Sequence, residues 1–147
     1  MIYLYEIFAA FAGTLGFGFL FNIRGKKLWL AAAGGMLSWV LFLVLGLWIE
    51  SQVLRYFLVS VLLSLYAEIL ARLLKTPSTT FCIVSLIPLI PGGSLYYTMA
   101  YALQEHQLFV GSAVHTLQLA AALSLGIVLV TALMRSIRDF KNKYHNH

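Results

Sequence analysis

Charge is scarce in this sequence. Only 10% of its 147 residues are Asp, Glu, Lys or Arg, whereas 61% are hydrophobic. A chain of this size with so few charged side chains has too little polar surface to cover a water-soluble globule. The composition therefore excludes a soluble domain and predicts an integral membrane protein, with the lipid bilayer as its surroundings.

Cysteine, aspartate and clustered metal ligands are almost absent. Cys82 is the only cysteine, which excludes an intrachain disulfide, and its apolar neighbours favour a packed thiol over a reactive one. Asp139 is the only aspartate, and the four glutamates lie in separate segments. A membrane aspartyl protease needs two aspartates in its spans, and a metalloenzyme needs clustered ligands. We therefore expect neither a metal site nor a cofactor.

Motifs of catalysis are equally sparse. Ser94 follows two glycines, but the only conceivable base for a Ser–His arrangement is His115 in the next apolar run. The sequence has no Walker motif, so nucleotide hydrolysis by this chain would not power transport. We expect that the protein is not an enzyme.

Five apolar runs are separated by short polar or turn segments. Each run approaches the length of about 20 residues that a helix needs to cross the hydrocarbon core. The runs are 2–21, 28–48, 53–74, 79–103 and 110–134. We predict an all-α membrane protein with a single transmembrane domain over 1–137 and a basic tail over 138–147. The first run lacks a basic start and carries Glu6, so we expect it to be retained rather than cleaved as a signal peptide.

Basic residues are distributed unevenly between the two ends of the spans. Nine of the ten follow the first, third and fifth runs, and only Arg55 lies at the opposite end. Basic residues are enriched on the cytoplasmic side of membrane proteins. We therefore predict an N-terminus outside the cell and a cytoplasmic C-terminus. The same rule explains the net charge of +5 without a nucleic acid partner.

Two prolines and a glycine pair interrupt the fourth run. The segment Pro88-Leu89-Ile90-Pro91-Gly92-Gly93 breaks the helix at membrane depth, where irregular backbone is tolerated only if it is buried in protein or lines a cavity. A second half-helix starting near Gly92 would point free N–H groups toward the membrane centre, where they favour a carboxylate. The alternative interpretation is a proline kink repaired by neighbouring helices.

Three ionisable residues within the runs are further candidates. Glu68 and Arg72 stand at i and i+4 on one helical face, with Glu68 on the order of 9 Å inside the end of its span. A residue at that depth is a functional candidate, although an interfacial ion pair with Arg72 extending to the headgroups accounts for the same pattern. His115 is either a proton relay or a hydrogen-bonded structural residue.

The segment from Tyr66 to Ala102 carries a family resemblance. Ala67-Glu68-x-x-Ala71-Arg72 leads into Lys75-Thr76-Pro77-Ser78-Thr79 and then into Ile87-Pro88-Leu89-Ile90-Pro91-Gly92-Gly93-Ser94-Leu95-Tyr96-Tyr97-Thr98-Met99. This order resembles the threonine/serine exporter family. More narrowly, it is similar to the small five-span subunit that corresponds to the C-terminal half in split, two-component members.

The resemblance implies a subunit of a proton-driven secondary exporter in the bacterial cytoplasmic membrane. Its substrate would be threonine and serine, or a dicarboxylate such as succinate. Its partner would be a second membrane subunit that supplies the N-terminal half, and a homo-oligomer is also open. The alternatives are a structural assembly subunit without substrate contact and a homo-oligomeric channel.

The residue analysis and the resemblance together define one predicted site. The half-helix donors would hold a substrate carboxylate, and aromatic and hydroxyl side chains would line its path. The substrate-binding candidates are Pro88, Pro91, Gly92, Gly93, Ser94, Tyr96, Tyr97 and Thr98, and the coupling candidates are Glu68, Arg72 and His115.

Overall fold

A computed structural model of this protein describes residues 2–104 and 107–145. Within these ranges the regular structure is helical, without strands. The elements are α1 (Ile2–Leu20), α2 (Lys26–Gly46), α3 (Gln52–Leu74), α4 (Ser78–Leu86), the 3₁₀ turn η1 (Ile87–Leu89), α5 (Gly92–Leu103) and α6 (Phe109–His145). The predicted all-α class is confirmed.

The helices match the predicted number of spans. Among the described residues α1, α2, α3 and α6 are each long and apolar enough to cross a membrane. The segment Ser78–Leu89 and α5 form a fifth span if they are taken together. The helix axis bends by 56° between them. The prediction of about five spans, with the fourth one broken, is therefore confirmed.

Local turn chemistry sets both ends of α3. The side chain of Ser51 accepts a hydrogen bond from the backbone N–H of Leu54 at 3.4 Å, which caps the first turn. Lys75 ends the helix in the left-handed conformation, with φ at 48°. Pro77 lies directly before α4 and prevents α3 from continuing into it.

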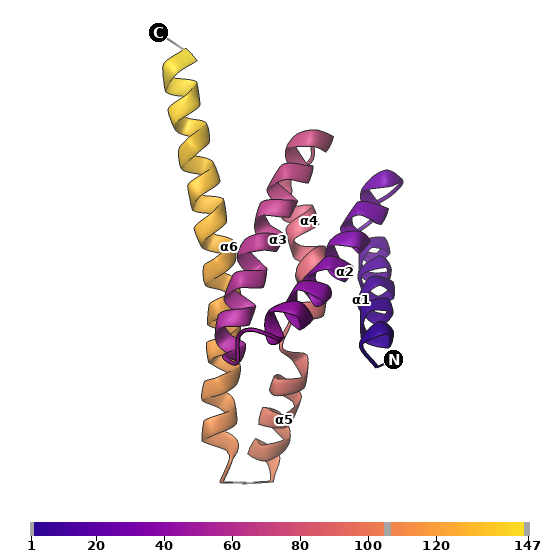
Figure 1. Cartoon of the computed structure of the whole chain (residues 1–147), viewed down its shortest axis with the longest axis vertical. Coiled ribbons are helices and arrows are strands. Elements are labelled where there is room, and N and C mark those ends of the chain that lie inside the picture. The colour runs from indigo at the N-terminus through magenta and orange to yellow at the C-terminus, as the bar shows by residue number, and fades with distance from the viewer. Residues whose placement is uncertain (1, 105–106, 146–147) are drawn as a thin grey trace.

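The helix α3 lies at the centre of the bundle. It packs against α2, α4 and α6, while α1 packs mainly against α2 on the far side (Figure 1). The half-helix α5 packs chiefly against the first part of α6, and the two extend past the ends of α1, α2 and α3 (Figure 1). The α5 half-helix therefore has much less protein around it than α4.

The last helix is longer than the span predicted within it. The 37 residues of α6 correspond to about 55 Å at 1.5 Å per residue, against a hydrocarbon core of about 30 Å. The helix runs through the predicted span 110–134 and into the predicted tail 138–147, whose last two residues lie outside the described residues. The change at residue 135 is therefore one of polarity, not the end of a helix.

Small residues allow the helices to approach closely. A Cβ at Gly34 would collide with the Ser85 hydroxyl of α4, and a Cβ at Gly35 would collide with Thr14 of α1. Ser85 donates a hydrogen bond to the carbonyl oxygen of Ala31 at 3.3 Å. Such small-residue contacts and interhelical hydrogen bonds are what hold helices together where lipid removes the hydrophobic drive.

The contact between α3 and α6 depends on Gly126. A Cβ there would collide with the Ser60 hydroxyl and lie 2.9 Å from the backbone carbonyl oxygen of Phe57. The Ser60 hydroxyl already donates to that same oxygen at 2.8 Å, so it has little freedom to move away. The backbone oxygen cannot move without shifting α3.

We expect Gly126→Ala to lower the free energy of unfolding by about 1–3 kcal/mol, the usual cost of overpacking a tight contact. Gly111→Ala on the same helix is the matched control, because a Cβ there has nothing within 4 Å. That control should be neutral or stabilising, since alanine favours helix over glycine. Thermal unfolding of both variants in detergent tests the pair, and equal melting temperatures would contradict the packing argument.

Candidate functional site

The break between α4 and α5 is a tight turn centred on Pro91. With φ at −73° and ψ at 54°, Pro91 forms an inverse γ-turn in which the Gly92 N–H donates to the Ile90 carbonyl oxygen at 2.6 Å. The Leu95 N–H donates to the Pro91 carbonyl oxygen at 3.0 Å, and α5 has no side-chain cap. Within the described part of the chain, the N–H groups of Gly93 and Ser94 therefore have no acceptor.

The glycines of the break face open space. A Cβ at Gly92 or at Gly93 would meet no atom within 4 Å. The free N–H groups of the first turn of α5 thus lie at the surface of this chain, where a ligand or another protein can reach them. That these N–H groups hold a substrate carboxylate stays a prediction.

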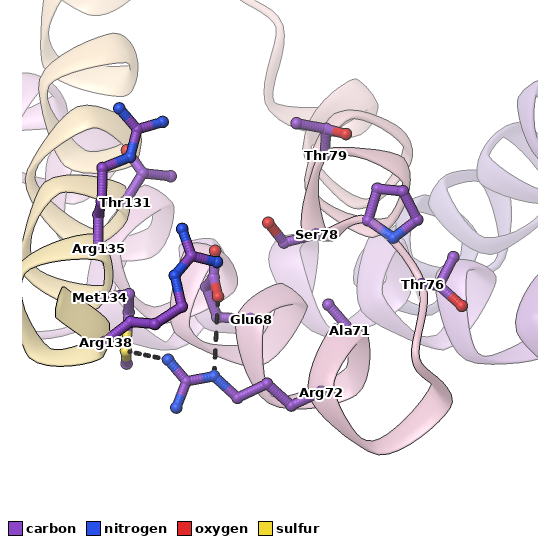
Figure 2. Close-up of a pocket in the computed structure, with 11 residues that line it drawn as sticks. Glu68, Ala71, Arg72, Thr76, Ser78, Thr79, Thr131, Met134, Arg135 and Arg138 are labelled. Atoms are coloured by element: carbon purple, nitrogen blue, oxygen red, sulfur yellow. Dashed lines mark hydrogen bonds and ion pairs between the residues drawn. The ribbon is translucent and has the colours of Figure 1, made fainter. Parts of the chain in front are cut away.

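A cavity of about 410 Å³ lies where α3 ends, α4 begins and α6 passes them (Figure 2). We call it the charged vestibule. Its lining consists of Glu68, Ala71, Arg72, Thr76, Pro77, Ser78, Thr79, Thr131, Met134, Arg135 and Arg138. Figure 2 shows Arg135 and Thr131 on α6 across from Ser78 and Thr79. The lining combines three guanidinium groups, one carboxylate and several hydroxyl groups.

Positive charge is in excess in the charged vestibule. Arg72 Nε lies 4.0 Å from Glu68 Oε2, and Arg72 Nη2 lies 3.2 Å from the Met134 sulfur. The Glu68 side chain is only 17% exposed, against 55% for Arg72. Arg135 and Arg138 have no ion-pair partner among the described residues. The formal charge of the lining is therefore +2, which attracts anions.

A second, apolar cavity of about 280 Å³ adjoins the charged vestibule. We call it the inner cavity. Glu68, Ser78, Thr79 and Thr131 line both spaces. The other residues of the inner cavity are Ser64, Ala67, Cys82, Ile83, Leu86, Ile87, Ile90, Leu123 and Ile127. Because Ile87 and Ile90 belong to the break, the two cavities form a path from the charged residues to the interrupted helix, with Glu68 at their junction.

The predicted coupling residues separate into two places. Glu68 and Arg72 lie together in the charged vestibule. His115 instead has its Nε2 3.1 Å from the side-chain oxygen of Gln52, the first residue of α3. Sixteen residues of helix separate Gln52 from Glu68, a distance of about 24 Å. The structure therefore does not bring His115 to Glu68.

The predicted residues of α5 point in different directions. Tyr96 and Tyr97 are both exposed, with ring centroids 5.5 Å apart. Thr98 is buried, and its hydroxyl lies 2.7 Å from the Ser112 hydroxyl and 3.0 Å from the Thr116 hydroxyl of α6. Thr98 thus ties α5 to α6, whereas the two tyrosines lie on the outer face of the half-helix.

Sequence reasoning missed the contribution of α6 to the charged vestibule. By sequence alone, Arg135 and Arg138 belong only to the basic residues that follow the fifth run. Their spacing from Thr131 indicates a shared helical face, because residues four and seven positions apart lie on the same side of a helix. That face meets α3 and α4 only in the folded chain. No cluster of three or more His, Cys, Asp or Glu that suits a metal ion occurs among the described residues.

Comparison with known proteins gives one match. The family model described as "Threonine/Serine exporter, ThrE" matches residues 6–133. The matched range includes the break and the whole lining of the inner cavity, and it ends just before Met134. No curated protein and no solved structure matches the chain.

We expect a thiol introduced by Thr79→Cys to react faster with a negatively charged methanethiosulfonate than with a positively charged one. The Cys82→Ser background leaves this thiol as the only one in the chain. The preference should be on the order of tenfold at low salt and should shrink at high salt, because the field of the arginines is screened.

Removal of charge from the lining provides the control. Arg135→Gln together with Arg138→Gln should abolish most of the preference for the anionic reagent. Lys75→Asn removes an exposed charge nearby that does not line the charged vestibule, and asparagine tolerates the left-handed backbone there. An equal loss of preference in Lys75→Asn would show that the whole surface, not the vestibule, attracts the reagent.

Proposed function

Because this chain belongs to the threonine/serine exporter family, we propose that it is one subunit of a secondary exporter in the bacterial cytoplasmic membrane. In this proposal the charged vestibule opens to the cytoplasm and receives the substrate. The observation that carries the proposal is the continuity of the vestibule, the inner cavity and the break. The path has the charged groups of the vestibule at one end and the unpaired N–H groups of α5 at the other, with the inner cavity between them.

The substrate group that this path suits is a carboxylate. Guanidinium groups bind carboxylates strongly and with defined geometry, and the first turn of a helix binds them through its N–H groups. Threonine, serine and dicarboxylates all carry this group. The lining charge of +2 attracts a dianion more strongly than a zwitterion. Within the range of substrates expected from the resemblance, the vestibule therefore favours a dicarboxylate such as succinate.

Proton coupling is assigned to Glu68. Its carboxylate lies at the junction of the two cavities and pairs with Arg72. An ionisable group inside a span commonly serves as a proton relay.

A second membrane subunit is needed to complete the site. The N–H groups of Gly93 and Ser94 lie at the surface of this chain, and unpaired backbone groups cost several kcal/mol each in hydrocarbon. The outer face of α5 is also apolar and aromatic. We propose that the covering partner supplies the N-terminal half of the exporter, as the resemblance implies. A second copy of this chain is the alternative cover.

We expect export of preloaded threonine, serine or succinate only when this chain is expressed with its partner subunit, in bacterial cells that lack their own exporters. A protonophore should abolish that export. Gly93→Leu should also abolish it, because its side chain would occupy the open space that the substrate or partner must enter. Membrane insertion should be unaffected, since a Cβ there meets nothing in this chain.

The control for this variant is Gly111→Leu, which places the same side chain in open space on α6. Full export by Gly93→Leu would contradict a site at the break. Export by this chain alone would favour a self-sufficient homo-oligomer. Normal export after removal of the vestibule arginines would favour an assembly subunit that does not contact the substrate.

We expect Glu68→Gln to uncouple export from the proton gradient. Glutamine keeps the size and a hydrogen-bonding oxygen but cannot exchange a proton. An imposed pH gradient should then accelerate efflux in the wild type and leave Glu68→Gln unchanged, as measured in proteoliposomes containing both subunits. The same acceleration in both proteins would show that Glu68 does not couple protons and that its pair with Arg72 is structural.

A further inference from the structure

Arg55 lies in the first turn of α3, at the end of the bundle opposite the charged vestibule. Its Nε atom is buried and has no hydrogen-bond partner among the described residues. Its guanidinium carbon lies 4.9 Å from the centroid of the Phe42 ring. A cation–π contact supplies only part of what a guanidinium loses when it leaves water. Arg55 therefore needs an acceptor that its own neighbours do not supply.

Among the described residues, no carboxylate pairs with Arg55. Glu6, in α1, accepts a hydrogen bond from Trp39 Nε1 at 3.2 Å, and the Trp39 ring stacks on Phe42 with centroids 5.5 Å apart. The aromatic pair thus engages Glu6 on one side and Arg55 through Phe42 on the other. No ion pair involves Arg55 within the described ranges. The described residues therefore leave the guanidinium of Arg55 without an anionic partner.

A groove of about 470 Å³ leads to Arg55. We call it the Arg55 groove. Its lining is Tyr3, Ile7, Val40, Leu43, Val44, Gly46, Leu47 and Arg55, so one cation lies among almost entirely apolar side chains from α1 and α2. Val44 and Leu47 are exposed, which shows that the groove opens sideways to the surroundings of the protein. A polar solute would lose its hydration in such an apolar space without gaining hydrogen bonds.

The guanidinium of Arg55 packs against Gly46 at the end of α2. A Cβ at this position would lie 2.7 Å from Arg55 Nη1, so the guanidinium crosses the end of α2 in close contact with Gly46. The carbonyl groups of the last turn of α2 carry partial negative charge, which favours a cation there. Three helices therefore surround Arg55. The residue belongs to α3, its guanidinium contacts Gly46 of α2, and Tyr3 and Ile7 of α1 line the other side of the groove.

Exposed aromatic residues gather at the end of α1 and α2 where the Arg55 groove lies. Trp48 follows α2, Tyr3 and Tyr5 lie near the start of α1, and all three are exposed. Exposed Trp and Tyr at helix ends are typical of the headgroup region. Such residues favour headgroup depth for the end of the groove next to Arg55, while the rest of its lining is apolar.

We propose that the Arg55 groove binds an anionic phospholipid, with the phosphate on Arg55 and an acyl chain along the apolar lining. The ligand class follows from the combination of one unpaired guanidinium, an apolar groove open to lipid and a position at headgroup depth. A carboxylate of a partner subunit would satisfy the charge but would leave the length of the apolar groove unexplained. The bound lipid stabilises the contact of α1, α2 and α3 at this end.

The test uses the purified full chain in detergent, titrated with phosphatidylglycerol or phosphatidylcholine and followed by native mass spectrometry and thermal unfolding. We expect the wild type to bind phosphatidylglycerol roughly fivefold more tightly than phosphatidylcholine, the preference that one basic residue at an anionic headgroup provides. Arg55→Gln should lose this preference, and Arg55→Lys should retain most of it. Arg24→Gln, at the other end of the bundle, should leave it unchanged.

A second variant separates binding from folding. Val44→Trp fills the groove and leaves Arg55 in place, so it should lower the affinity for phosphatidylglycerol even if Arg55→Gln does not fold. A phosphatidylglycerol preference that survives both variants would overturn the proposal. So would loss of the preference in the wild type when the second subunit is bound, because a protein carboxylate would then be the acceptor.

Discussion

The constraint on which this structure depends is that every backbone N–H and C=O group in hydrocarbon must find a partner inside protein. Four continuous helices satisfy it within themselves. The break at Pro91 does not, because its γ-turn leaves the N–H groups of Gly93 and Ser94 without acceptors in this chain. The open space around Gly93 and the thin packing of α5 accompany that interruption.

The central position of α3 organises the charges as well as the packing. Its first turn carries Arg55, which lies at an aromatic interface, and its last turns carry Glu68 and Arg72, which line the charged vestibule. The middle of the helix contacts α6 through Ser60 and Gly126 without any charge. Ionisable groups are thus kept at the two ends of the bundle, where water and headgroups reduce their cost.

In the proposed exporter, transport combines two incomplete halves. This chain supplies charge at one end of a path and helix donors at the other, while the inner cavity between them is apolar. An apolar cavity holds a hydrophilic solute only if polar groups at both ends, or on a partner, replace its water. The proposed second membrane subunit would cover the apolar and aromatic outer face of α5.

The sequence by itself determined the class, the spans and the break. Hydropathy marks the spans, Pro91 and Gly92 mark the turn, and the pairing of Glu68 with Arg72 is one turn of helix; all these signals are local in the chain. Only the tertiary structure decided that Arg135 and Arg138 join Glu68, that His115 pairs with Gln52 instead, and that Thr98 faces α6. Each of these depends on which face of one helix meets another far away in sequence. Small-residue packing such as that of Gly126 against Ser60 sets those faces, and hydropathy does not encode it.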